Sequence, residues 1–170
     1  QLFDSIVETG EEFDLAHFGM YAMESMRLEK SYRMWGSDLT REYSILEAGL
    51  DRFVKFKKDY FVGKQALLDQ KDTGVPQEFI TLEIDTIDAD AMGSEPVFLP
   101  GNSALSGEMI GRATSGCFGH SIGKSLALAY VKKGNSVIGT ELQIEILGEK
   151  RLARVINESP CDPENKKLRA

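Results

Sequence analysis

The alternation of apolar and polar residues after Pro76 limits the possible fold more than any other feature of the chain. Ile80, Leu82 and Ile84 are separated by single polar residues, a period of two that is typical of a strand with one buried face. Further strand-like runs follow at residues 96–99, 108–114, 126–131, 141–147 and 152–156. Turns rich in Gly, Asn and Ser separate these runs, as at residues 100–103 and 133–136. Six short strands in about ninety residues predict a small closed barrel or a sandwich.

The first half of the chain lacks this alternation and predicts mixed elements. Four apolar residues share one face of an expected helix over residues 1–13: Leu2, Phe3, Ile6 and Val7. We expect strands over residues 26–30 and 50–56, and a helix over residues 63–70. Charged residues followed by Gly and Pro make residues 71–76 typical of a linker. The expected domains are therefore residues 1–74 and 75–170.

Charge and composition exclude several classes of function. The formal net charge of −7 argues against a nucleic-acid partner, whose phosphates need Lys and Arg. No apolar run approaches the roughly 18 residues of a membrane span. Cys117 and His120 are spaced C-x-x-H, but no second pair of zinc ligands lies nearby, so we expect no metal. No G-x-G-x-x-G follows a strand, so a dinucleotide or flavin site is not expected in these residues.

Several motifs in a fixed order carry a resemblance to a known family. They are M-Y-A-M-E-S-M-R-L-E-K from Met20, W-G-S-D-L-T from Trp35, E-A-G-L-D-R-F-V from Glu47 and D-Y-F-V-G-K-Q-A-L-L from Asp59. A later block, T-S-G-C-F-G-H-S-I-G-K-S-L-A-L-A-Y-V from Thr114, agrees with them. Together they resemble the folate-binding half of the aminomethyltransferase family, the T-protein of the glycine cleavage system and its fusions. The sequence motifs R-L-E-K and W-G are most similar to the C-terminal portion of dimethylglycine and sarcosine dehydrogenases.

The resemblance implies an α+β fold. Residues 1–74 would form the later part of an α/β second domain of the three-domain T-protein cloverleaf, and residues 75–170 its small six-stranded antiparallel β-barrel. The chain would then begin inside a longer protein. A first folate domain and a flavin domain with FAD would precede it in cis.

The function implied by the resemblance is transfer of a one-carbon unit. It would pass from an oxidised N-methyl amine, dimethylglycine or sarcosine, to tetrahydrofolate. The residues present would include no catalytic group, because the family's catalytic Asp lies in the first domain. A glycine cleavage aminomethyltransferase or a folate-dependent demethylase is the alternative within the family, and a non-enzymatic protein-docking barrel is the alternative outside it. Expected locations are the bacterial cytoplasm or the mitochondrial matrix.

Four residues are candidates for the folate-binding wall: Arg27, Glu29, Trp35 and Glu47. On a strand, Arg27 and Glu29 would share one face, either as an ion pair or as the wall of a pocket for a flat heteroaromatic ring. Trp35 is expected in the core or stacked on a ligand, and Glu47 as a turn cap or a pocket carboxylate. The T-proteins carry an Arg four residues before Arg27, where this chain has Met23. The apolar face of the N-terminal helix also predicts pairing with a second copy.

Overall fold

The computed structural model describes residues 1–101 and 107–169, so half of the turn expected at residues 100–103 lies outside the described part. The helices are α1 (Leu2–Gly10), α2 (Met20–Glu29) and α3 (Lys64–Thr73). The strands are β1 (Gln77–Ile84), β2 (Pro96–Phe98), β3 (Met109–Gly119), β4 (Lys124–Lys132), β5 (Glu141–Ile146) and β6 (Glu149–Ile156). Short 3-10 turns occur at Glu11–Phe13, Asp51–Phe53 and Lys167–Arg169.

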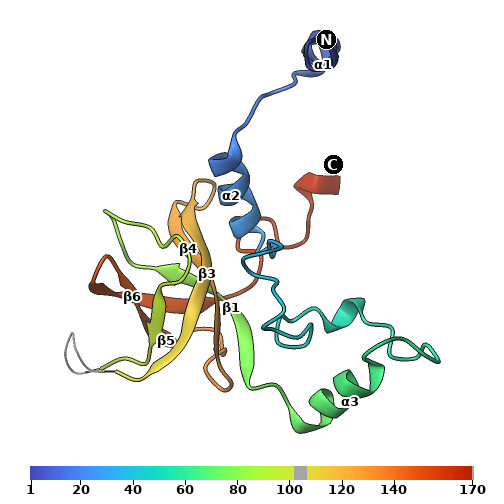
Figure 1. The fold of residues 1–170 in the computed structure, drawn as a ribbon. Coiled ribbons are helices and arrows are strands. Elements are labelled where there is room, and N and C mark those ends of the chain that lie inside the picture. Colours follow the sequence, from blue (N-terminus) through green and yellow to red (C-terminus); the bar gives the residue numbers. More distant parts are fainter. Residues whose placement is uncertain (102–106, 170) are drawn as a thin grey trace.

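The strands close into an antiparallel barrel in the order β1-β4-β3-β2-β5-β6, which confirms the predicted α+β fold with a six-stranded barrel (Figure 1). The period-two pattern of β1 places Ile80 opposite Ala129 and Leu82 opposite Ala127. These inward-facing side chains join one buried apolar cluster that also includes Val97, Ile110, Ala113, Leu142, Ile144, Ala153 and Val155. Closure pairs every strand on both sides and removes the exposed edges of an open sheet.

Strand β4 is buried on both faces, because other parts of the chain pack on the outside of the barrel. Its outward residues Leu126, Leu128 and Tyr130 belong to a second buried cluster. The other buried members of that cluster are Leu28 of α2, Ala48 and Phe79. This outer layer fixes α2 and the loop after it against β3 and β4, and it positions the site described below.

The two strands expected in the first half are absent, and both predictions were wrong. Residues 26–30 fall at the end of α2, whose buried positions are Ser25, Leu28 and Glu29. Their spacing of i, i+3 and i+4 is helical, but two of the three are polar, so apolar periodicity did not reveal it. Residues 50–56 instead form the turn at Asp51–Phe53, in which the Phe53 amide donates to the Leu50 carbonyl at 3.0 Å.

Helices α1 and α3 agree with the sequence pattern, and the expected linker is shorter than predicted. Residues 71–73 still belong to α3, and only residues 74–76 separate it from β1. Helix α1 stands away from the barrel and has no buried residue, so Leu2, Phe3 and Ile6 are exposed (Figure 1). Pairing of two copies through this face stays a prediction, as does the domain boundary at residues 74 and 75. Within the described residues, no helix is long and apolar enough to cross a membrane.

Gly111 offers a test of the contact between β3 and β4. A Cβ at this position would lie 2.1 Å from the Tyr130 carbonyl oxygen and 2.8 Å from the Val131 Cα, and both are backbone atoms. We expect Gly111→Ala to lower the free energy of unfolding by about 3 kcal/mol, because the two strands must move apart. Urea denaturation measures this change.

Gly19→Ala is the matched control, because nothing lies within 4 Å of its added Cβ. Because Gly19 is the N-cap of α2, where Ala is a poorer cap than Gly, the change should lower the stability by about 1 kcal/mol at most. Equal stability of the two variants would contradict the close approach of β3 to β4.

Candidate functional site

The carboxylate of Asp38 is the centre of a buried polar network between α2 and the barrel. Its side chain is completely buried. Its Oδ1 accepts hydrogen bonds from Thr114 at 2.5 Å and from Ser115 at 2.8 Å, both on β3. Its Oδ2 accepts from Arg27 and from the Met34 amide, each at 2.7 Å. The buried charge is therefore paired and fully hydrogen-bonded, as such a charge must be.

Tyr130 adds a second connection to the same loop. Its hydroxyl donates to the Asp38 carbonyl at 2.8 Å, and its ring stacks on Tyr43 with centroids 3.6 Å apart. Burial, followed by the charge of Asp38, raises the pKa of the Tyr130 hydroxyl above its usual value, so the group remains a donor. The loop after α2 is thus held to β4 as well as to β3.

Arg27 uses its whole guanidinium group inside the protein. Nε donates to Glu24 at 2.7 Å, Nη1 to Asp38 at 2.7 Å and Nη2 to Ser115 at 2.8 Å. Only 11% of the side chain is exposed. Since Arg27 and Glu29 lie on a helix, they do not share the face that a strand would have given them. Arg27 holds α2 to the barrel, and the structure does not pair it with Glu29.

Glu29 and Glu47 are also buried and hydrogen-bonded to backbone. Glu29 Oε1 accepts from the Ser121 amide at 2.5 Å, in the turn between β3 and β4. Glu47 Oε2 accepts from the Ser44 amide at 2.8 Å, while the Glu47 amide donates to Ser44 Oγ at 3.2 Å. This reciprocal pair is the arrangement of a turn cap, the structural alternative considered for Glu47.

Trp35 is the one sequence candidate that faces solvent. Its side chain is 81% exposed, so the core alternative was wrong. It begins the Trp35–Asp38 stretch that ends at the buried carboxylate, and a backbone bridge joins it to Leu39. An exposed indole on a loop anchored this firmly is available to stack on a flat ligand.

A hollow beside the end of α2, here called the α2 hollow, was not predicted from the sequence. It has a volume of about 380 Å³. Its lining consists of Met26, Glu29, Lys30, Tyr32, Ser121, Cys161, Asp162 and Lys167. Met26 and Tyr32 are each about half exposed. Of the four sequence candidates, only Glu29 lies here, and the others are separated from it by the fold.

The chain's C-terminal tail forms one side of the α2 hollow. The Cys161 amide donates to the Glu29 carbonyl at 3.0 Å, and Lys30 Nζ donates to the Cys161 and Asp162 carbonyls at 3.1 and 2.5 Å. The Ser159 amide donates to Ser31 Oγ at 3.0 Å. These contacts join residues about 130 apart in sequence, so no local pattern predicts them.

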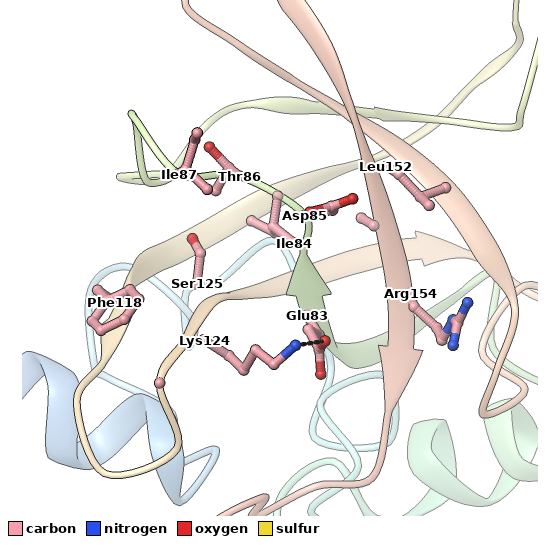
Figure 2. Close-up of a pocket in the computed structure, with 12 residues that line it drawn as sticks. Glu83, Ile84, Asp85, Thr86, Ile87, Phe118, Lys124, Ser125, Leu152 and Arg154 are labelled. Atoms are coloured by element: carbon pink, nitrogen blue, oxygen red, sulfur yellow. Dashed lines mark ion pairs between the residues drawn. The ribbon is translucent and has the colours of Figure 1, made fainter.

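Another hollow lies at the end of the barrel, where β1 ends and β4 begins (Figure 2). Its two cations are already paired: Lys124 Nζ lies 2.9 Å from Glu83, and Arg154 lies 3.2 Å from Glu141. Ser125 Oγ, which is buried, makes no hydrogen bond within the part of the chain that the structure describes. The paired charges make this hollow a weaker candidate than the one beside α2.

Cys117 on β3 is poorly suited to nucleophilic chemistry. Burial raises the pKa of its thiol from an ordinary 9.0 to about 11. At pH 8 its thiolate fraction, and with it the alkylation rate by iodoacetamide, should be roughly 100-fold lower in the folded protein than in urea. The reaction should become faster as the pH rises toward 11. Mass spectrometry of the Cys117 peptide measures both rates, and equal rates in the two states would contradict this burial.

Comparison with known proteins supports the resemblance read from the motifs. A profile described as "Glycine cleavage T-protein C-terminal barrel domain" matches residues 77–162, which include all six strands of the barrel. A profile described as "GCVT N-terminal domain" matches residues 1–58. The chain belongs to the glycine cleavage T-protein family.

The relatives of this chain include proteins with two different names, dimethylglycine dehydrogenase and aminomethyltransferase. Dimethylglycine dehydrogenase, mitochondrial, of Rattus norvegicus is 40% identical over 158 residues, which are 92% of this chain and 18% of the relative. The human protein of the same name is 39% identical over the same length. The aminomethyltransferase of Symbiobacterium thermophilum is 33% identical over 160 residues, 94% of this chain and 40% of that protein.

A solved structure of the T-protein family has the same fold. Glycine cleavage system aminomethyltransferase T from Bartonella henselae superposes with a TM-score of 0.74 at 28% sequence identity. The match covers 84% of this chain and 38% of that one. The chain therefore spans two fifths or less of the length of the relatives named here.

Asp38→Asn tests the buried network. The amide has one acceptor oxygen and no charge, so it cannot accept from all four of the present donors, and Arg27 would lose its fully buried countercharge. We expect the free energy of unfolding to fall by about 3 kcal/mol in urea denaturation.

Glu164→Gln is the control, because it removes a carboxylate from an ion pair with Lys166 in which both side chains are more than two-thirds exposed. Its effect should be much smaller, since exposed pairs contribute little. If both variants lost the same stability, Asp38 would not be the centre of the contact between α2 and the barrel.

Proposed function

We propose that these residues are the C-terminal, folate-binding part of a dimethylglycine- or sarcosine-dehydrogenase-type enzyme. In the whole protein, an N-methyl amine would be oxidised on FAD and its one-carbon unit passed to tetrahydrofolate. The observation that carries the proposal is the 40% identity to a dimethylglycine dehydrogenase over 158 residues, against 33% to an aminomethyltransferase. The sequence motifs R-L-E-K and W-G also favour the dehydrogenase type over the aminomethyltransferase type.

The α2 hollow is the proposed folate wall of this chain. Tyr32 and Met26 offer an aromatic and a polarisable side chain for a flat ring, and both are accessible. Glu29 closes the back of the hollow, where a carboxylate can accept from the ring's amino and imino groups. Lys167 at the rim carries a charge suited to a carboxylate tail. Trp35 lies outside the hollow, on the loop after α2, and would contribute a second stacking surface for a part of the ligand that extends beyond the hollow.

Arg27 and Glu47 support the proposed wall without contacting the ligand. Arg27 uses its guanidinium nitrogens on Glu24, Asp38 and Ser115, so it fixes the end of α2 that carries Met26 and Glu29. Glu47 fixes the loop that packs beside Phe79, whose amide donates to the Glu47 carbonyl at 3.0 Å. Both are therefore positioning residues in this proposal.

The described residues supply position and shape, and the cofactors supply the chemistry. A folate amine held beside an electrophilic one-carbon unit makes the transfer effectively intramolecular. The flavin domain and the first folate domain would complete the site in cis. Residues 1–170 alone should be inactive and should bind tetrahydrofolate weakly or not at all.

The two alternatives differ in what the rest of the protein would do. A glycine cleavage aminomethyltransferase or folate-dependent demethylase would use the same wall with no flavin. A docking barrel would bind a protein and no folate. The dehydrogenase relatives named above are mitochondrial, so the mitochondrial matrix is the proposed location if the source is eukaryotic, and the cytoplasm if it is bacterial.

The test uses the full-length protein with Tyr32→Ala, Glu29→Ala and Trp35→Ala variants. Loss of one aromatic stacking surface should weaken tetrahydrofolate binding roughly two- to tenfold in calorimetry, because such contacts contribute about 0.5–1.5 kcal/mol. Reduction of the flavin by dimethylglycine should not change. Tyr60→Ala, which removes a ring that is 74% exposed and outside the α2 hollow, is the control.

Two results would contradict the proposal. A parallel fall of folate binding and flavin reduction would place the effect on folding or domain docking. Micromolar binding of tetrahydrofolate by residues 1–170 alone would mean that these residues form a complete site.

A further inference from the structure

A third hollow, which is polar, lies between the loop after α2 and strand β3. It has a volume of about 510 Å³. Its lining consists of Gly36, Ser37, Thr40, Arg41, Glu42, Ser94, Arg112, Ala113 and Thr114. We call it the arginine hollow. It shares no residue with the α2 hollow, so the inference below does not depend on the proposed function.

The charges that line the arginine hollow are two arginines and one glutamate. Arg112 Nη2 donates to Glu42 Oε2 at 3.2 Å and to the Tyr43 hydroxyl at 3.4 Å, so this guanidinium is held in place. Arg41 makes no hydrogen bond or ion pair with any residue that the structure describes. The lining therefore has a net charge of +1, in a chain whose net charge is −7. Its free guanidinium can bind an anion.

The buried acid next to the arginine hollow does not oppose an anion there. Asp38 accepts from Thr114 and Ser115, and it is paired with Arg27. A carboxylate that is completely buried and neutralised by its own partners is screened from the hollow. Glu42 is the one acid in the lining, and Arg112 is its partner.

Ser94 lines the hollow, and its backbone conformation is strained. Its φ of 81° is in the left-handed region, which favours glycine over other residues. The turn is held in this conformation by two contacts: the Ser94 amide donates to the Ala113 carbonyl at 2.8 Å, and Glu95 accepts from the Gly93 amide at 2.8 Å. Strain that the surroundings enforce in this way is typical of ligand sites.

We propose that the arginine hollow binds a small oxyanion, a carboxylate or a phosphate group. Arg41 would hold two of its oxygens through the planar guanidinium fork, a geometry that suits both groups. The hydroxyls of Ser37, Thr40 and Ser94 would donate to the remaining oxygens. Arg112, fixed by Glu42 and Tyr43, supplies the second positive charge.

The experiment is a titration of residues 1–170 with inorganic phosphate and, separately, with sodium acetate, followed by amide NMR. Sodium chloride keeps the ionic strength constant, so general screening does not contribute. Saturable shifts should be confined to the amides of the lining, such as Gly36, Ser37 and Ser94. Saturation by phosphate alone assigns a phosphoryl ligand, and saturation by acetate alone or by both assigns a carboxylate or a general oxyanion site. Absence of saturation with both overturns the proposal.

Arg41→Gln should weaken the saturable binding about tenfold or more, because it removes a charge-assisted contact. Arg52→Gln is the matched control: it makes the same change of charge at an arginine outside the hollow, one that stacks over Phe53. Equal affinity of wild type, Arg41→Gln and Arg52→Gln would overturn the proposal.

Ser94→Gly distinguishes a binding role of Ser94 from a purely structural one, because anion binding and melting temperature should change in opposite directions. It removes the hydroxyl and relieves the left-handed strain, so binding should weaken while the melting temperature rises. It also keeps the proposal testable if Arg41→Gln fails to fold. Unchanged binding in Ser94→Gly together with unchanged binding in Arg41→Gln would show that neither side chain contacts the anion.

Discussion

The structure depends on one buried carboxylate. Asp38 has no contact with water, so a charge at this place would be very costly without partners. Its partners come from α2, from its own loop and from β3, and its carbonyl is bound by Tyr130 of β4. Satisfying one acid therefore joins α2 and its loop to strands β3 and β4, whose partner residues lie 76 and 92 residues from Asp38. The network also positions residues that line two hollows. Met26 and Glu29 of α2 line the α2 hollow, and Ser37 and Thr114 line the arginine hollow.

The barrel could be predicted from the sequence because its pattern has a local cause. In β5, buried and more exposed residues alternate, and in β1 every second residue from Ile80 to Ile84 is apolar and joins the barrel core, so a period of two marks each strand. Even β4, which is buried on both faces, was recognisable as a continuous apolar run. The end of helix α2 was predicted as a strand because Ser25 and Glu29 are buried for their hydrogen bonds to the β3–β4 turn, and polar residues do not contribute to an apolar period.

The candidate site could be predicted only in part, because its contacts are not local. Arg27 and Glu29 were candidates for the folate wall, but their partners Ser115 and Ser121 lie 88 and 92 residues away. Glu47 is engaged in a turn cap, and Trp35 is exposed. Tyr32 and Met26 became candidates only when the fold placed the tail beside them. A sequence shows which residues are unusual, while the partners that decide their roles depend on the tertiary structure.

The burial of β4 on both faces has a consequence for the dynamics of the protein. Strands with packed layers on each side have the highest local free energy of opening, and their amide hydrogens exchange last. Here the outer layer comes from Leu28 and Ala48, in the first half of the chain, and the inner layer from the barrel itself. Opening of the loop around Asp38 would expose the outer face of β4 to solvent. The loop around Asp38 therefore helps to keep β4 away from solvent, and slow amide exchange in β4 depends on packing from both halves of the chain.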